Sequence, residues 1–183
     1  MRKGEDLAVF VYGTLMPGER SWAEHCEGRV VEMKRARVRG RLYDLKAAGY
    51  PAMAMEEGNS KFKIEDSKMM GEAGDGWVKG WWLRLKDEAA LRGLDAWEGY
   101  EAGRLYSENE YERVRVECWG EENLKDEVRM MNKNGKGFTT KSAEKGGGES
   151  LGEAWVYVMG VEKIAALEGV EVPGGEWRGR GEC

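Results

Sequence analysis

The fold is decided by residues 9–19, which read Val-Phe-Val-Tyr-Gly-Thr-Leu-Met-Pro-Gly-Glu. A short apolar run rich in β-branched and aromatic residues is typical of a buried strand. Gly13 allows backbone angles that other residues avoid, and Pro17 prevents the strand from continuing. The pattern predicts a loop at the end of a strand, with amide N–H groups placed to hold an anion or a polarised carbonyl oxygen. An ordinary strand followed by a turn fits the same residues.

Gly13 and Gly18 have the spacing of the two glycines in a phosphate-binding P-loop. That loop requires Lys and then Ser or Thr directly after the second glycine, to contact the phosphates and magnesium. Glu19 and Arg20 stand at these positions, and the carboxylate would repel a triphosphate. We therefore exclude a nucleotide-binding P-loop.

The composition is that of a globular chain with a heavily charged surface. The 183 residues suit one domain, and 34 acidic against 29 basic side chains give a net charge of −5. This balance argues against a general nucleic-acid or membrane-surface binder. No N-terminal apolar segment has the pattern of a signal peptide, and we expect no membrane-spanning run. The scattered Cys26, Cys118 and Cys183 fit a reducing compartment. We expect a soluble, cytoplasmic protein.

Short strands dominate the predicted secondary structure, with a few helices between them. The predicted strands are 8–12, 35–43, 49–55, 77–85, 111–119 and 153–159, and the predicted helices are 21–26, 86–97 and 161–167. Ser21 is the expected N-cap of the first helix, with Glu24 as its capping-box partner. These elements predict an α+β fold, either a mixed sheet or a small β-barrel with helices attached.

The helix predicted at 86–97 carries the clearest signals. Asp87 is its expected N-cap, and an apolar stripe at helical spacing consists of Ala90, Leu91, Leu94 and Trp97. Gly99 supplies a stop, which puts Glu98 at the last turn. A carboxylate there opposes the helix dipole, so it is an unfavourable place for a glutamate without a function.

Arginines alternate with small or apolar residues in the strand predicted at 35–43. Arg35, Arg37, Arg39 and Arg41 therefore share one face. That face is either a basic patch for an anionic partner or the solvated face of an antiparallel strand, salt-bridged to acidic neighbours. The acidic composition favours the second interpretation.

Glycine-rich stretches indicate two irregular parts in a single domain that spans 1–183. A mobile insertion or long hairpin is expected at 120–150, because a structureless loop of that length is unusual in a compact domain. Residues 173–183 are expected to form a loose tail.

The chemical inventory is short. His25 is the single histidine, and no CxxC pair or GxGxxG fingerprint is present, so we expect neither a metal site nor a cofactor. His25 and Cys26 are adjacent and point apart on a helix or a strand, so they are not a ready nucleophile and base. Carboxylates, tyrosines and main-chain amides remain, and they suit proton transfer with oxyanion stabilisation.

Residues 9–15 (Val-Phe-Val-Tyr-Gly-Thr-Leu) resemble the opening motif of the γ-glutamylcyclotransferase-like family, also called the AIG2-like family. Residues 94–100 (Leu-Asp-Ala-Trp-Glu-Gly-Tyr) resemble the block that carries the family's catalytic glutamate. Further segments in the family's order are 40–45, 49–52, 111–114 and 154–158. The resemblance implies a small mixed β-barrel with flanking helices.

The resemblance also implies a reaction and the residues that perform it. Glu98 would be the general acid/base, taking a proton from the α-amine of a γ-glutamyl amide. The amine would close a five-membered ring on the side-chain carbonyl and release 5-oxoproline, and proximity would supply much of the acceleration. Main-chain amides of Gly13, Thr14 and Leu15 would hold the γ-glutamyl group.

Aromatic side chains are the expected walls of this pocket. Tyr12, Tyr50 and Tyr157 are candidate substrate-binding residues and hydroxyl donors, and core packing explains Tyr12 equally well. A dry pocket would raise the pKa of the carboxyl of Glu98, and the tryptophans that could exclude water are Trp81, Trp82 and Trp97. The segment 101–110 is longer than in some relatives, so Tyr100 before it or Tyr106 within it could fill a pocket role.

The expected partner is a small-molecule γ-glutamyl substrate. We expect a monomer or weak dimer, and no binding to nucleic acid or to a membrane. The Tyr-Gly-Thr-Leu motif with its proline-containing loop looks closest to the γ-glutamylamine branch of the family. The insertion at 120–150 would then be a lid over the leaving-group side. Two alternatives stay open, because a fold does not fix a function: a lyase or transferase acting on a specialised metabolite, or a non-catalytic binding module.

Overall fold

The structure is a computed structural model that describes residues 7–55, 76–121 and 148–179. Its elements, in chain order, are β1 (Ala8–Val11), α1 (Trp22–His25), β2 (Val30–Arg39), β3 (Arg41–Leu45), β4 (Tyr50–Ala54), β5 (Trp77–Leu85), α2 (Glu88–Trp97), β6 (Glu112–Gly120), β7 (Ser150–Val158), α3 (Val161–Ala166) and β8 (Val170–Glu171).

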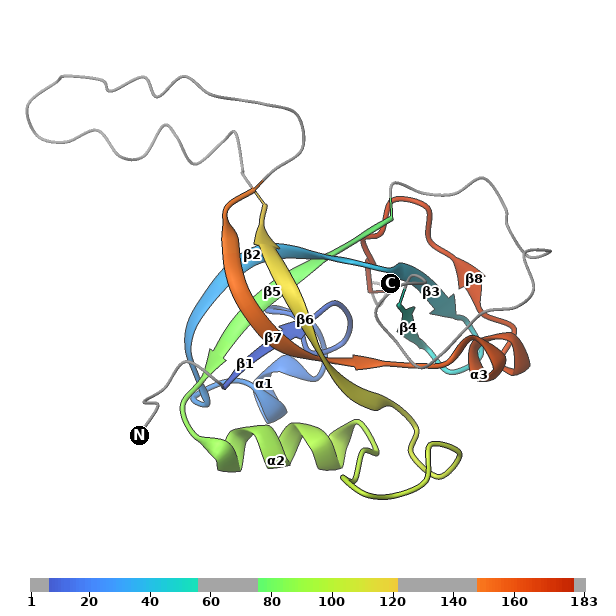
Figure 1. The fold of residues 1–183 in the computed structure, drawn as a ribbon, viewed down its shortest axis with the longest axis horizontal. Coiled ribbons are helices and arrows are strands. Elements are labelled where there is room, and N and C mark those ends of the chain that lie inside the picture. Colours follow the sequence, from blue (N-terminus) through green and yellow to red (C-terminus); the bar gives the residue numbers. More distant parts are fainter. Residues whose placement is uncertain (1–6, 56–75, 122–147, 180–183) are drawn as a thin grey trace, which may run out of the picture.

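Five of these strands close into a barrel in the order β1-β5-β2-β6-β7 (Figure 1). The neighbours pair antiparallel except β1 and β7, which run parallel where Val9 lies opposite Trp155 and so close the barrel. Every second side chain of such strands points inward, and fully buried Phe10, Leu83 and Val156 belong to the core. The prediction of an α+β fold built on a small mixed β-barrel is confirmed.

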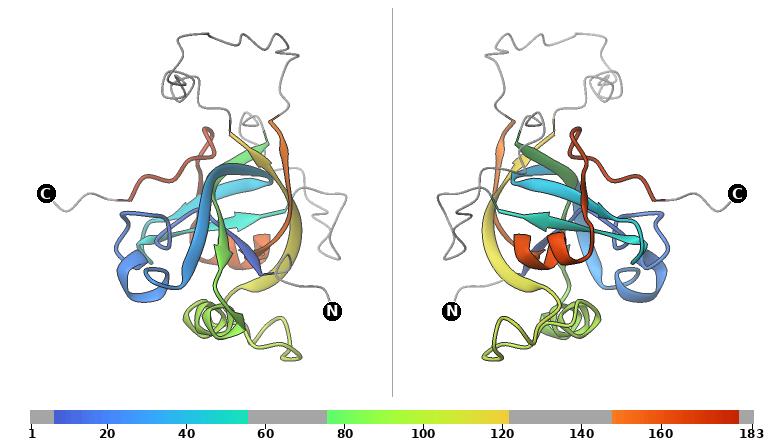
Figure 2. Two further views of the ribbon diagram at one scale, coloured as in Figure 1. Left: turned by 90° about the vertical axis from the view of Figure 1, so that its left-hand side faces the viewer. Right: turned by 90° about the vertical axis from the view of Figure 1, so that its right-hand side faces the viewer.

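The remaining described strands form a second sheet beside the barrel, in the order β4-β3-β8. The helix α3 lies against this side, and α2 lies below the barrel in all the views of Figures 1 and 2. Within the described ranges, every helix is too short or too polar to span a bilayer.

Gly40 corrects the prediction of one strand over 35–43. The chain forms two strands, β2 and β3, which belong to different sheets. Gly40 has a φ of 154°, and a Cβ there would lie only 2.8 Å from the carbonyl oxygen of Ala54. The chain leaves the barrel at this residue because only glycine fits both the angle and the contact.

The arginines of β2 already have partners within the fold. Arg35 pairs with Glu176 at 3.1 Å, and the guanidinium groups of Arg37 and Arg39 lie 4.3 and 4.0 Å from the ring centre of Trp77. Since β2 and β5 are antiparallel neighbours, these contacts support the interpretation of a solvent-facing strand surface.

The predicted capping box of α1 is wrong. Ser21 occupies the N-cap position, but its φ of −97° and ψ of −3° are helical and its side chain makes no cap hydrogen bond. An N-cap side chain reaches the first amides from extended backbone. The amide of Ser21 instead donates to the carbonyl oxygen of Thr14 at 3.1 Å, and thereby fixes the loop that follows β1.

The predicted N-cap of α2 is confirmed. Oδ1 of Asp87 accepts a 2.9 Å hydrogen bond from the amide of Ala90, and the buried residues of the helix are Ala90, Leu91 and Leu94. Trp97 does not continue the stripe, because it is 46% exposed and its ring stacks on His25 at 4.1 Å between centres. The end of α2 therefore turns away from the core.

The described part of the predicted tail, 173–179, is attached to the barrel. The amide of Lys79 donates a 2.7 Å hydrogen bond to the carbonyl oxygen of Gly175, and Trp177 is buried in the core. A loose tail is therefore the wrong description for these residues, while 180–183 lie outside the described residues. Most of the predicted insertion, 122–147, also lies outside them, and its two ends continue β6 and β7.

Candidate active site

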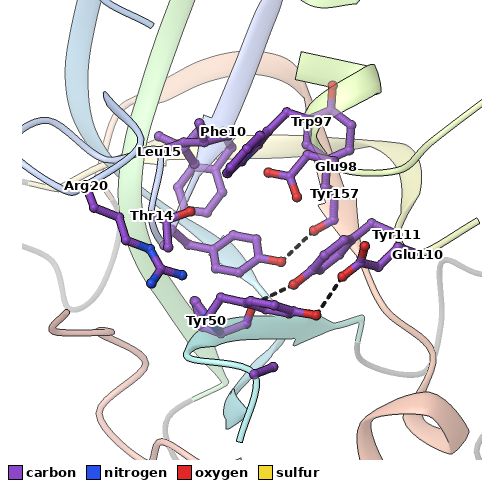
Figure 3. A pocket seen from close by; sticks show the side chains of 15 residues that line it. Phe10, Thr14, Leu15, Arg20, Tyr50, Trp97, Glu98, Glu110, Tyr111 and Tyr157 are labelled. Atoms are coloured by element: carbon purple, nitrogen blue, oxygen red, sulfur yellow. Dashed lines mark hydrogen bonds between the residues drawn. The ribbon is translucent and has the colours of Figure 1, made fainter. Parts of the chain in front are cut away.

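A cavity of about 340 Å³ opens beside the end of β1, between the barrel and the second sheet (Figure 3). The residues that line it come from six separate parts of the chain: Phe10, Val11, Tyr12, Gly13, Thr14, Leu15, Arg20, Ala48, Tyr50, Pro51, Trp97, Glu98, Glu110, Tyr111 and Tyr157. All seven residues predicted for the site are among them. The cavity is large enough for a small-molecule ligand.

Glu98 projects its carboxyl group into this cavity from the end of α2 (Figure 3). Its amide still bonds to Leu94 at 2.9 Å, and Gly99, with a φ of 63°, turns the chain out of the helix. Burial, and then the negative charge of Glu110, raise the pKa of the Glu98 carboxyl from 4.5 to about 8. The group can therefore both accept and donate a proton near neutral pH.

The loop after β1 presents three backbone amides. Among the described residues, none accepts a hydrogen bond from the amides of Gly13, Thr14 or Leu15. A close contact explains why residue 13 is a glycine, because a Cβ there would lie 2.6 Å from Cγ of Pro51. Its backbone angle does not require glycine, since its φ is not positive. Amides held in this way can stabilise an anion or a polarised carbonyl oxygen.

Buried phenols form the floor of the cavity. The hydroxyl of Tyr12 donates to the carbonyl oxygen of Tyr157 at 2.7 Å and accepts from the amide of Met53 at 3.2 Å. The hydroxyl of Tyr111 donates to the carbonyl oxygen of Pro51 at 2.8 Å. Burial raises the pKa of both phenols well above 10, so both remain donors.

Tyr157 is fixed by an ion pair behind the cavity wall. Its hydroxyl donates to Oδ1 of Asp95 at 2.8 Å, and Nη1 of Arg113 lies 2.7 Å from Oδ2 of the same carboxylate. Burial is the main cause of the raised pKa of Tyr157, and Asp95 adds to it. Because Asp95 lies one turn before Glu98 on α2, the same network holds the helix end in place.

Among the lining residues that the sequence did not point to, three carry polar side chains: Arg20, Glu110 and Tyr111. The hydroxyl of Tyr50 donates to Oε1 of Glu110 at 2.6 Å, and burial with this contact raises the pKa of Tyr50 to about 12. Glu110 and Tyr111 come directly before β6, and Arg20 follows the β1 loop. Only the closed barrel brings them to Glu98. Tyr111 begins the family-like segment 111–114, whereas no local pattern marks Arg20 or Glu110.

A sequence profile of the family described as gamma-glutamyl cyclotransferase, AIG2-like, matches residues 9–179. The chain belongs to this family. The match includes the β1 loop, the end of α2 and the strands that carry the other lining residues. No curated protein sequence matches the chain.

One of the similar solved structures shows the same fold. An AIG2-like protein (GGACT) from Mus musculus is 18% identical with a TM-score of 0.50, and the alignment covers 84% of this chain and 76% of that protein. YkqA from Bacillus subtilis is 19% identical with a TM-score of 0.48, over 94% of this chain and 39% of YkqA. A uropathogenic E. coli-specific protein is 15% identical with a TM-score of 0.47, over 94% and 92%. The chain thus spans less than half the length of YkqA.

Four aromatic residues predicted for the cyclotransferase-like pocket lie elsewhere. Tyr100 lies under Arg113, 5.0 Å from its guanidinium, and Tyr106 packs beside Lys163. The other two, Trp81 and Trp82, lie on β5 under basic side chains of β2. Trp97 is the tryptophan that lines the described cavity. Among the described residues, no group of three or more His, Cys, Asp or Glu side chains could hold a metal ion.

Proposed function

We propose that the protein is a γ-glutamylcyclotransferase that releases 5-oxoproline from a γ-glutamyl amine or amide. The observation that carries this proposal is the carboxyl of Glu98, which has a pKa of about 8 and lies in a cavity beside three amides with no described partner. The family of the chain supports the reaction class. The open cavity also argues against a member whose pocket has collapsed.

Glu98 suits proton transfer with an amine because the two pKa values match. An α-amino group has a pKa near 8, and the carboxyl of Glu98 has a pKa of about 8. A proton therefore moves from the substrate ammonium to Glu98 at little cost in free energy. The freed amine can then attack the side-chain carbonyl of its own γ-glutamyl group, which lies within reach without a second molecule.

The amides of Gly13, Thr14 and Leu15 would bind the γ-glutamyl group while the ring closes, and Tyr12, Tyr50 and Tyr157 would form the walls. The α-nitrogen forms a bond to the side-chain carbonyl carbon, and the bond from that carbon to the leaving nitrogen breaks. Two protons pass from the α-nitrogen to the leaving nitrogen, with Glu98 as the carrier. The reaction consumes no water and changes no oxidation state.

One observation favours a leaving group of the kind that the γ-glutamylamine branch of the family releases. Glu110 places a second carboxylate, exposed to solvent, at the rim of the cavity beside Tyr50. A carboxylate at the rim attracts a leaving group that carries a positive charge and repels one that carries a free carboxylate. We therefore expect γ-glutamyl amines to react faster than glutathione.

The test is 5-oxoproline release from γ-glutamyl amines, γ-glutamyl dipeptides and glutathione. Wild type should release it, and Glu98→Gln should lose at least about a hundredfold in rate, as expected for a general acid/base. Glu88→Gln is the matched control, because it makes the same change at an exposed position of α2. Equal rates in wild type and Glu98→Gln would exclude Glu98 as the proton carrier. No release from any substrate by wild type would overturn the proposed reaction.

A further inference from the structure

The charged groups of the cavity lie at two separate poles. Glu98 and Glu110 lie on one side, and Arg20 lies across the cavity from them (Figure 3). Arg20 is the only cationic side chain among the lining residues that the structure describes. A ligand that fills the cavity is therefore oriented by its own charges.

Arg20 has guanidinium N–H donors available to bind a ligand. Its Nη2 donates a 3.0 Å hydrogen bond to the carbonyl oxygen of Gly49, and no carboxylate in the described part of the chain lies within ion-pair distance. A guanidinium has five N–H donors, so most remain available. Arg84 and Arg113, by contrast, are each paired with a carboxylate.

Two contacts restrict the exposed Arg20: one hydrogen bond of its guanidinium and one of the backbone beside it. Gly49 has a φ of 78° and its amide bonds to Leu45 at 2.8 Å, which fixes the carbonyl group that Arg20 contacts. On the other side, the bond from the amide of Ser21 to Thr14 fixes the backbone next to Arg20. A guanidinium that already makes one hydrogen bond loses less freedom on binding an anion than an unrestrained one.

The α-carbon of a γ-glutamyl substrate carries an amine and a carboxylate. Ring closure requires the amine to face Glu98, and the carboxylate is repelled by the same acidic pole. We propose that Arg20 binds the α-carboxylate of the substrate and so makes the enzyme specific for γ-glutamyl groups with a free α-carboxylate. The amides of Gly13–Leu15 are then left for the side-chain carbonyl oxygen. This inference rests on the proposed function for the identity of the ligand.

A binding experiment with the reaction product tests the role of Arg20 without requiring turnover. Calorimetric titration at about pH 6.5, where Glu98 is protonated, would compare 5-oxoproline with its uncharged carboxamide. Wild type should bind the acid about tenfold more tightly than the amide, because a charge-assisted pair is lost with the amide. Arg20→Gln should bind both with the amide's affinity, and Arg20→Lys should keep part of the preference.

Arg92→Gln is the matched control, since Arg92 is exposed on α2 and pairs only with Glu88 among the described residues. It should keep the wild-type preference. The preference is a ratio within one protein, so a partly unfolded variant lowers both signals equally. The inference is overturned if Arg20→Gln keeps the wild-type preference, or if wild type binds acid and amide equally or binds neither. An Arg20-dependent preference without 5-oxoproline release would overturn only the proposed reaction.

Discussion

The hydroxyl of Tyr12 donates a 2.7 Å hydrogen bond to the carbonyl oxygen of Tyr157, 145 residues further along the chain. The hydroxyl oxygen of Tyr12 also accepts a 3.2 Å hydrogen bond from the amide of Met53. One phenol therefore joins the ends of β1, β4 and β7 beneath the cavity. Tyr12 is thus both a core residue and a wall of the site, and these two roles are separable by experiment.

Tyr12→Phe should lower the free energy of unfolding by about 1–3 kcal/mol, because the buried carbonyl of Tyr157 and the amide of Met53 each lose a partner. Urea unfolding measures the change. Tyr100→Phe is the control, since the Tyr100 hydroxyl makes no hydrogen bond within the described residues. Equal stability of Tyr12→Phe and wild type would show that this bonding contributes nothing net.

Glu98→Gln should become more stable relative to wild type as pH rises. Folding raises the pKa of Glu98 from 4.5 to about 8, so the folded state holds the extra proton between these values. The resulting stabilisation of wild type is complete below 4.5 and is lost as pH rises through about 8. The difference in free energy of unfolding should change by about 4 kcal/mol in favour of the variant between about pH 5 and pH 9.

Urea unfolding of both proteins across this pH range measures that difference. Glu88→Gln should follow the wild-type trend, because its carboxyl is exposed at the other end of α2. A difference between wild type and Glu98→Gln that does not vary with pH would show that Glu98 titrates alike in the folded and unfolded chains.

Glu110→Gln should lower the pKa of Glu98. The negative charge of Glu110 is the second cause of the raised value, after burial. Its removal should move the titration of the Glu98 carboxyl carbon in a ¹³C NMR spectrum down by about half a pH unit. Added salt should move wild type in the same direction, because Glu110 is exposed and its field is screened.

Glu108→Gln is the control for that experiment, since Glu108 lies in the same loop but outside the cavity lining. It should leave the titration of Glu98 unchanged. If Glu110→Gln also leaves it unchanged, the two carboxylates do not interact and burial alone raises the pKa of Glu98.

Gly13→Ala should destabilise the protein by about 1–3 kcal/mol, because the new Cβ would lie 2.6 Å from the rigid ring of Pro51. Thermal unfolding measures this cost, and binding of 5-oxoproline should weaken because the loop and Pro51 both line the cavity. Gly174→Ala should have little effect, as nothing lies within 4 Å of its Cβ position. Unchanged stability and affinity in Gly13→Ala would mean that the contact relaxes freely.

Local patterns were sufficient for much of the fold. The strand predicted at 77–85 has those bounds in the structure, and Asp87 caps α2 as expected. Both predictions depend on signals within a few neighbouring residues. The break at Gly40 could not be found in this way, because the alternation of arginines runs through it without a change. Its cause is the carbonyl of Ala54, which lies in a different strand.

The parts of the site that lie in recognisable sequence motifs could be predicted. The β1 loop and Glu98 were found from segments that resemble a family, and both line the cavity. Arg20 and Glu110 were missed because each is an unremarkable charged residue in a loop. They acquire a role only when barrel closure sets them across from each other, and that requires contacts far apart in the sequence.

The parallel contact between β1 and β7 has a consequence for the synthesis of the protein. The barrel strand made first is completed by the one made last, so the chain cannot close until Trp155 has left the ribosome. Bringing together two strands so far apart in the sequence is slow, and until then β1 exposes an apolar surface and an unpaired edge. The cavity therefore cannot form on a nascent chain that ends before β7, whatever the state of the segments already made.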